Sequence, residues 1–534
     1  MNEINNTSDH FSFSRKIFFR EWTIFLLSFA GLFFILRDHL SDPPFGDDLY
    51  VTWNSSYRIL KSDLRGSGPF SLNHFDPGHP YLFYFMISTG WRVMGTFFMW
   101  PHLLTIFFSS LGLLYAYKLG RVVYHETVGL LSFLLLLCNP MFLATSAMIH
   151  LNIPTLTALV LCLYYIIMKK RLALALCLGL LVSFKAYGIV MAFTIYVSVF
   201  VYYSLLKPKR ASFGDLVRTS IPFLAAPLVF LFFCLVRYLM TGNFLSSPVY
   251  SVNSQMHFPD SLGTYWENLK FMSWHRFLKH AEMGLMAGLS LSILFIQTLL
   301  RVRGRRPPPQ RGNDDSPGEK KPLFLILTFL PPLLMLLFFS IRTKGNMSTY
   351  MLPFYPLVYI AFAGLFLSLP RFLKPYFYIL VMILCGLNII RWDIQRIESF
   401  RYLGRPLQKY LRTSTPMNNG YLKPIGALQR SALYIQRNYP DSIICASYPE
   451  EMAFSEPGAG YVHQPFTTYS EKRNSVLQKT DSFLKAGKTI IFVDSYYSVI
   501  SSPKNFPEKY RPFRVKKFTC SSFPYSIELW YLAP

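Results

Sequence analysis

Long apolar segments separated by short polar connections dominate this chain. A bilayer core needs roughly 20 apolar residues per helix, and fewer when flanking side chains reach the interface. On that measure the sequence predicts eleven membrane-spanning helices, the fifth being the shortest. They cover residues 22–36, 97–117, 128–147, 154–168, 172–184, 186–206, 219–239, 283–300, 322–340, 349–369 and 375–391.

The composition agrees with a membrane protein. Of 534 residues, 52% are hydrophobic and only 15% are charged, which is too apolar for an ordinary soluble protein. We therefore predict an α-helical multi-pass membrane protein. No small-residue cleavage site follows the first apolar segment, so we expect that segment to remain as a signal anchor, with residues 1–20 in the cytoplasm.

The net charge of +25 would suggest nucleic-acid binding in a soluble protein. Here much of the excess lies in short connections between apolar segments, where it orients the chain in the membrane. We therefore expect membrane lipids, and no nucleic acid, as partners. The basic connections that fix one cytoplasmic side are Lys118/Arg121, Lys169–Arg171, Lys207–Arg210, residues 301–321 and Arg371/Lys374.

Because successive spans cross the membrane in opposite directions, the other connections lie outside the cytoplasm. These are residues 37–96, the turn His150–Pro154, the loop 240–280 and everything after Trp392. This holds only if the apolar stretch Pro80–Gly95 does not cross the membrane. Its aromatic residues and Arg92 favour a helix that lies in the outer interface.

Three regions follow from these patterns. Residues 21–395 form the predicted transmembrane domain, interrupted at 301–321 by a Pro- and Gly-containing cytoplasmic linker that we expect to be disordered and to bind at most anionic lipid heads. Residues 421–534 form a predicted extracytoplasmic α/β domain. Its expected helices are 428–438 and 471–486, and its expected strands are 442–446, 489–494, 513–520 and 525–532.

The seven cysteines show no CxxC spacing, so a thiolate metal site is not expected. A disulfide between Cys445 and Cys520 would be compatible with an exported tail, although the sequence alone does not establish it.

The adjacent acids Asp47 and Asp48 are the strongest chemical feature. They follow Pro43–Gly46 directly after the first predicted span, where packing gives little reason for two adjacent carboxylates. An Asp can cap the helix that begins here, but capping explains one carboxylate and not two. We therefore favour a functional role over a structural one.

Several segments together resemble a known family. Gly46–Tyr50, Gly78–Tyr84, His150–Pro154, Phe184–Gly188 and Tyr350–Pro353 are similar to motifs of the GT-C glycosyltransferase superfamily. The nearest branches are the protein O-mannosyltransferase-like enzymes and the lipid A aminoarabinose transferases. The resemblance covers most of residues 20–370, although each motif alone is weak. Two positions depart from the family pattern: Asn152 stands where relatives commonly have Asp, and Tyr81 replaces a Pro.

The resemblance implies a GT-C-like fold and transfer of a hexose or pentose from a polyprenyl-phosphate donor. The acceptor would be a hydroxyl of an extracytoplasmic lipid, glycan or protein, with inversion if displacement is direct. Such transfer needs a base for the hydroxyl proton, a role we assign by similarity to Asp47. Asp48 would hold acceptor hydroxyls or tune the ionisation of the pair.

The leaving phosphate needs cations that stabilise its growing charge. We predict His79, Lys185, Arg342 and Lys344 as donor phosphate ligands, with Arg58 and His74 as weaker choices. Lys185 could instead merely reach the interface from an apolar run, and Arg342 and Lys344 could be interfacial anchors. The predicted substrate-binding residues are Tyr50, Asn152 and Tyr350. No metal ligands are assigned, and whether a divalent metal is needed stays open.

Two other classes of protein remain. A transporter or lipid-carrier flippase would also be basic and multi-pass, but it would place charges at mid-membrane, often in repeated halves. Here the charges collect in the outer loops, so we favour the enzyme. A non-catalytic descendant of such enzymes would share the fold, and Asn152 could mark lost activity. The predicted location is the plasma membrane, as in the inner membrane of a bacterium, with the active site outside the cytoplasm.

Overall fold

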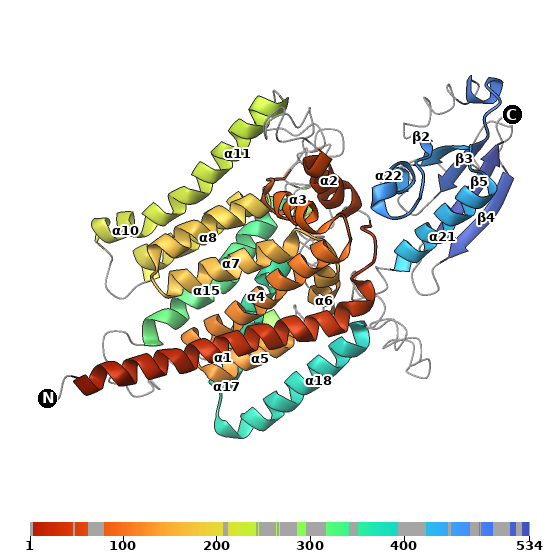
Figure 1. Ribbon diagram of the computed structural model, residues 1–534. Coiled ribbons are helices and arrows are strands. Elements are labelled where there is room, and N and C mark those ends of the chain that lie inside the picture. The colour runs from red at the N-terminus through yellow and green to blue at the C-terminus, as the bar shows by residue number, and fades with distance from the viewer. Residues whose placement is uncertain are drawn as a thin grey trace.

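The computed structural model shows a bundle of long helices with a small β-sheet at one end (Figure 1). It describes most of the chain. The described ranges are 4–45, 48–61, 79–206, 212–241, 286–294, 317–340, 351–392, 423–446, 450–469, 482–494, 513–519 and 526–532, with isolated positions 244, 263, 266, 267 and 480.

Each of the eleven predicted segments contains a helix. The bundle consists of α1 (Ile4–Leu36), α4 (Met99–Val123), α5 (Glu126–Leu137), α6 (Pro140–Ala147), α7 (Asn152–Ile167), α8 (Arg171–Phe184), α9 (Gly188–Val201), α11 (Ala225–Thr241), a helix at 286–294, α15 (Pro317–Ser340), α17 (Tyr355–Leu367) and α18 (Lys374–Trp392). Within the described ranges, six helices are long and apolar enough to cross a membrane, or seven if α5 and α6 count as one bent span. Three further apolar helices are shorter, so the count of eleven crossings stays a prediction.

The predicted single span 128–147 is wrong in one respect, because it is broken into α5 and α6 with a bend of 62°. Pro140 has no N–H and cannot continue α5, so it begins a new helix. Asn139 caps that helix, since its Oδ1 accepts a hydrogen bond from Phe142 N at 2.9 Å. Its Nδ2 donates to Tyr359 Oη on α17 at 2.8 Å, which fixes the break inside the bundle.

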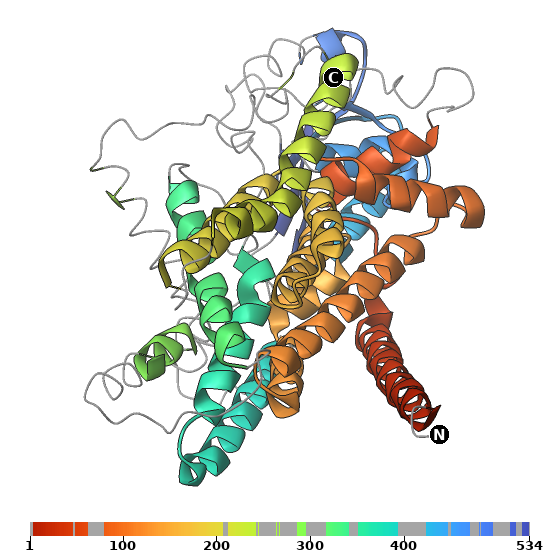
Figure 2. The same cartoon turned by 90° about the vertical axis from the view of Figure 1, so that its left-hand side faces the viewer.

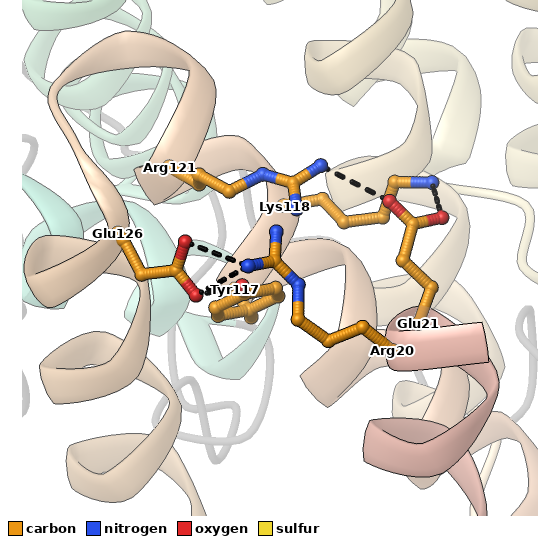
Figure 3. Close-up of polar contacts among 6 residues, drawn as sticks. All are labelled: Arg20, Glu21, Tyr117, Lys118, Arg121 and Glu126. Atoms are coloured by element: carbon orange, nitrogen blue, oxygen red, sulfur yellow. Dashed lines mark hydrogen bonds and ion pairs between the residues drawn. The ribbon is translucent and has the colours of Figure 1, made fainter. Parts of the chain in front are cut away.

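Helix α1 lies on the outside of the bundle, with the N-terminus at the end opposite the sheet (Figure 1). A polar network near that end joins α1 to α4 and α5 (Figure 3). Glu21 accepts from Lys118 Nζ at 2.8 Å and from Arg121 Nη2 at 3.0 Å. Arg20 donates to both oxygens of Glu126, at 2.9 and 3.0 Å. The network therefore fixes the start of the first predicted span against its neighbours.

The stretch predicted not to cross the membrane forms α3 (Leu82–Met94). Its 13 residues span about 20 Å, short of the roughly 30 Å of a bilayer core. Arg92 Nη2 donates to the carbonyl of Ile59 on α2 (Asn54–Lys61) at 3.2 Å, which ties the two helices together. The interfacial position of α3 stays a prediction.

The C-terminal part contains α21 (Lys423–Asn438), α22 (Glu450–Ser455) and a five-stranded sheet of order β2-β1-β3-β5-β4. Strands β1 (Ile443–Ala446), β3 (Ile490–Asp494), β4 (Phe513–Thr519) and β5 (Ser526–Leu532) lie where they were predicted, as does α21. Pairs β1–β2 and β1–β3 are parallel, whereas β3–β5 and β4–β5 are antiparallel. Strand β2 (Thr467–Tyr469) was not predicted from the sequence, because three residues at the sheet edge are too few to show an alternation of apolar and polar side chains.

Three predictions fall partly on residues outside the described ranges. Thr480 and residues 482–485 of the expected helix 471–486 are helical, while 471–479 and 481 lie outside the described residues. Cys445 is buried on β1, but Cys520 lies outside the described ranges, so their disulfide stays a prediction. Helix α15 begins at Pro317, so the last residues of the expected linker are helical and not disordered.

Candidate functional site

Four of the predicted site residues have described side chains: Asp48, His79, Asn152 and Lys185. The remaining predicted positions, together with the weaker choice His74, lie outside the described residues or, for Tyr50, have an undescribed side chain: Asp47, Tyr50, His74, Arg342, Lys344 and Tyr350. Arg58, the other weaker choice, donates from Nε to Asn54 Oδ1 at 3.1 Å on α2.

Asp48 opens a short π-helical segment, η2 (Asp48–Trp53), and is only 3% exposed. Its backbone N–H donates to the carbonyl of Phe45 at 3.2 Å. The residue lines a small cavity of about 10 Å³, shared with Asp42, His102 and the chain at 147–149. Such a cavity has room for about one water molecule. The structure thus buries this carboxylate beside a small, mostly apolar cavity.

The loop that leads to Asp48 is held by two histidines. His39 Nδ1 lies 2.8 Å from Asp42 Oδ2, and His102 Nε2 lies 3.1 Å from the carbonyl oxygen of Asp42. His102 comes from α4 and is 3% exposed. The loop therefore rests against the end of a long bundle helix, and not against solvent.

Lys185 lies at the tight turn between α8 and α9, where it is 4% exposed. Its Nζ donates to Asn152 Oδ1 at 2.6 Å and lies 5.0 Å from the centre of the Tyr187 ring. The turn requires glycine at Gly188, since a Cβ there would stand 2.3 Å from the carbonyl oxygen of Leu181. This geometry argues against a lysine that merely reaches for the interface, because the ammonium is buried and hydrogen-bonded.

Two further cationic or titratable groups lie, like Lys185, near His79. Arg237 on α11 is 4% exposed, and its guanidinium lies 4.4 Å from the centre of the Phe233 ring. His150 precedes α7, and its Nδ1 accepts a hydrogen bond from Asn152 N at 3.1 Å. We call His79, His150, Lys185 and Arg237 the cation cluster.

The pKa values of the two imidazoles reflect burial and the positive charge around them. Burial and then the positive charges of Lys185 and Arg237 hold the pKa of His79 well below its usual value. Burial and the Lys185 ammonium lower the pKa of His150 to about 3. Both imidazoles are therefore neutral at pH 7, and the site carries a positive potential from Lys185 and Arg237.

Asn152 adds a hydrogen-bond donor beside these cations. Its side chain is fully buried, and its Nδ2 has no hydrogen-bond partner within the described part of the chain. A buried donor without a partner is costly, so the position favours an acceptor such as a phosphate or sugar oxygen. The cation cluster and Asn152 include no carboxylate, and their groups suit an anion better than a metal cation.

One turn connects Asp48 with the cation cluster. Ala147, Met148 and Ile149 line the cavity of Asp48, and His150 follows them directly. The buried carboxylate and the cations thus lie around the connection between α6 and α7. Helices α2, α3 and α6 reach the same end of the bundle, next to the sheet (Figures 1 and 2).

Neither Arg237 nor His150 was assigned a role from the sequence. Arg237 was visible as the one arginine inside the predicted span 219–239, and an ionisable residue in such a segment commonly marks a functional site. His150 stood inside a motif of the resemblance, but nothing in its spacing indicated that it meets Lys185.

No protein-family model matches the chain, and no curated protein is similar to it in sequence. Solved structures do share its architecture. ArnT from Cupriavidus metallidurans in the apo state superposes with a TM-score of 0.57 at 13% identity, over 94% of this chain and 97% of that one. ArnT bound to undecaprenyl phosphate gives 0.51 at the same identity and coverage. An Archaeoglobus fulgidus oligosaccharyltransferase scores 0.49 at 11% identity, over 88% of this chain and 67% of that one, and we draw nothing from it.

This chain has the GT-C fold. The GT-C-like fold that the resemblance implied is therefore confirmed, and the structural similarity spans 94% of this chain. At 13% identity the similarity establishes the GT-C architecture alone, so the site residues have to be argued from their own geometry.

Proposed function

We propose that this GT-C protein is a glycosyltransferase that uses a polyprenyl-phosphate-linked sugar. The observation that carries the proposal is the placement of a buried carboxylate and a cation cluster around one turn at the same end of the bundle. The structural similarity to ArnT bound to undecaprenyl phosphate supports a lipid-phosphate donor at the level of the superfamily. The acceptor is a hydroxyl of an extracytoplasmic lipid, glycan or protein.

The acidic pair serves the acceptor. As the anomeric carbon loses its bond to phosphate, the attacking hydroxyl must lose its proton, and a carboxylate at hydrogen-bond distance can take it. We assign this base to Asp47 by similarity, with Asp48 as its buried neighbour. If the hydroxyl attacks directly from the face opposite the phosphate, the anomeric configuration inverts.

The cation cluster serves the donor. The phosphate gains negative charge as the glycosidic bond breaks, so Lys185 and Arg237 stabilise the transition state more than the ground state. Asn152 Nδ2 and the neutral imidazole of His79 can add hydrogen bonds to phosphate or sugar oxygens.

The test is transfer of labelled sugar in proteoliposomes from a panel of undecaprenyl-phosphate-linked pentoses and hexoses. We expect the catalytic member of the pair, changed in Asp47→Asn or Asp48→Asn, to lose at least ~100-fold in kcat, the usual scale for a general base. Lys185→Gln should lower kcat at least ~10-fold as well, because the charge-assisted bond to the phosphate strengthens as the phosphate gains negative charge.

Lys374→Gln is the matched control, since it removes a lysine at the start of α18, away from the cation cluster. Its kinetics should equal those of the native protein. Equal kcat in the native protein and both aspartate variants would remove the catalytic assignment. Movement of donor across the bilayer without a new glycosidic bond would favour the flippase alternative.

A further inference from the structure

A contact between distant parts of the chain holds the loop that carries the acidic pair. Tyr461, between α22 and β2, donates from its hydroxyl to the carbonyl oxygen of Pro44 at 2.9 Å. The two residues are 417 positions apart. Pro44 lies three residues before Asp47, so a residue of the C-terminal part bonds the backbone that leads to the predicted base.

Tyr461 makes this contact in a buried position. Its side chain is 3% exposed, and burial with the carboxylates of Asp42 and Glu450 nearby raises the pKa of its hydroxyl well above the usual value. The hydroxyl therefore remains protonated and can donate at any physiological pH. A neutral donor with a fixed acceptor makes a directional contact.

Two glycines beside Tyr461 let the C-terminal part approach the loop. Gly458 packs against Trp53 and Tyr57, since a Cβ there would lie 3.2 Å from both side chains. Gly460 has φ +81°, and a Cβ on it would stand 2.6 Å from the Phe98 ring and 3.4 Å from Pro43. The segment 458–461 is thus fitted to the chain on both sides of Asp48.

We propose that Tyr461 is a positioning residue for the acidic pair, so that the C-terminal α/β part is a component of the active site. This proposal rests on the function proposed above. The bond to the Pro44 carbonyl lies nearer to Asp47 than the contacts of Asp42 with His39 and His102. Without it the loop would still be attached at Asp42, but the chain nearer to Asp47 would lose one restraint.

Tyr461→Phe is the decisive variant, because it keeps the ring that packs in the interface and removes only the donor. We expect kcat to fall about 10-fold with the donor KM unchanged within twofold, since sub-ångström misplacement of a reacting group lowers kcat and leaves donor binding intact. Amide hydrogen exchange across residues 45–53 should become faster in the same variant, and the melting temperature should shift little.

Tyr434→Phe is the matched control. Its hydroxyl bonds Tyr439 within the C-terminal part and does not reach the loop. The control should keep native kcat and native exchange at 45–53. Native kcat and native exchange in Tyr461→Phe would overturn the proposal. If the native protein transfers no sugar, the proposed function fails, whereas the exchange measurement still decides whether Tyr461 restrains the loop.

Discussion

The contacts around Asn152 show why a neutral side chain suits that position. Its Oδ1 accepts from the Lys185 ammonium, its backbone N–H donates to His150, and its Nδ2 stays available. A carboxylate at the same place would pair with Lys185 and cancel much of the charge that a phosphate needs. The departure from the family pattern is therefore compatible with a site that binds an anion.

His150 gives a prediction about pH. Its pKa is about 3 in the folded protein against 6.5 for a free imidazole, so between these values the unfolded chain binds a proton that the folded chain excludes. Stability should therefore fall as the pH drops below about 6.5. His150→Asn keeps an acceptor for Asn152 N and removes the titration, so its melting temperature should fall less between pH 7.5 and 5.0. Equal decreases in both proteins would contradict the assignment.

The residue types of the site were predictable, but their partners were not. Lys185, His79 and Asn152 stood in recognisable motifs, and the structure places Lys185 against Asn152 as a buried pair. Arg237 was not assigned, because the meeting of α11 with the turn after α8 depends on packing between helices. Sequence periodicity describes one helix at a time and does not specify that packing.

Among the elements, α1 lies at the edge of the bundle and is held by both packing and polar contacts. Its outward face exposes large apolar side chains, Leu27 and Phe34 being 68% and 66% exposed. Glu21 of α1 pairs with Lys118 and Arg121 through one carboxylate (Figure 3). The three side chains are 12–20% exposed. Such partly buried pairs contribute more than surface pairs do.

Glu21→Gln should therefore destabilise the protein. Loss of two hydrogen bonds to a charged acceptor costs roughly 1.5–3 kcal/mol, visible as a lower melting temperature in detergent. Asp38→Asn is the control, because its pair with Arg37 is 65% and 83% exposed and should contribute little. An equal, small shift in both variants would show that the network does not hold α1.

The helices themselves followed from the sequence, because a run of apolar residues has few alternatives in a membrane. The break between α5 and α6 was missed, although Asn139–Pro140 carried the signal of a cap and a helix start. The strand β2 was missed for a different reason, since three residues at a sheet edge are too few for a periodic pattern.

The whole molecule places the N-terminus and the sheet at opposite ends of the bundle (Figures 1 and 2). The predicted topology puts these ends on opposite sides of the membrane, with the cation cluster and Asp48 on the outer side. The docking of segment 458–461 onto the loop before Asp47 was beyond prediction, because a contact across 417 residues leaves no local pattern.

Mass balance of the reaction tests the account most directly. The native protein in proteoliposomes receives undecaprenyl-phosphate-linked sugar labelled on both the sugar and the phosphorus, with a membrane extract as acceptor. The account predicts one undecaprenyl phosphate, with its phosphorus label on the lipid, for each sugar joined to a hydroxyl. Release of labelled sugar phosphate, or intact donor in the opposite leaflet with no labelled acceptor, would contradict it.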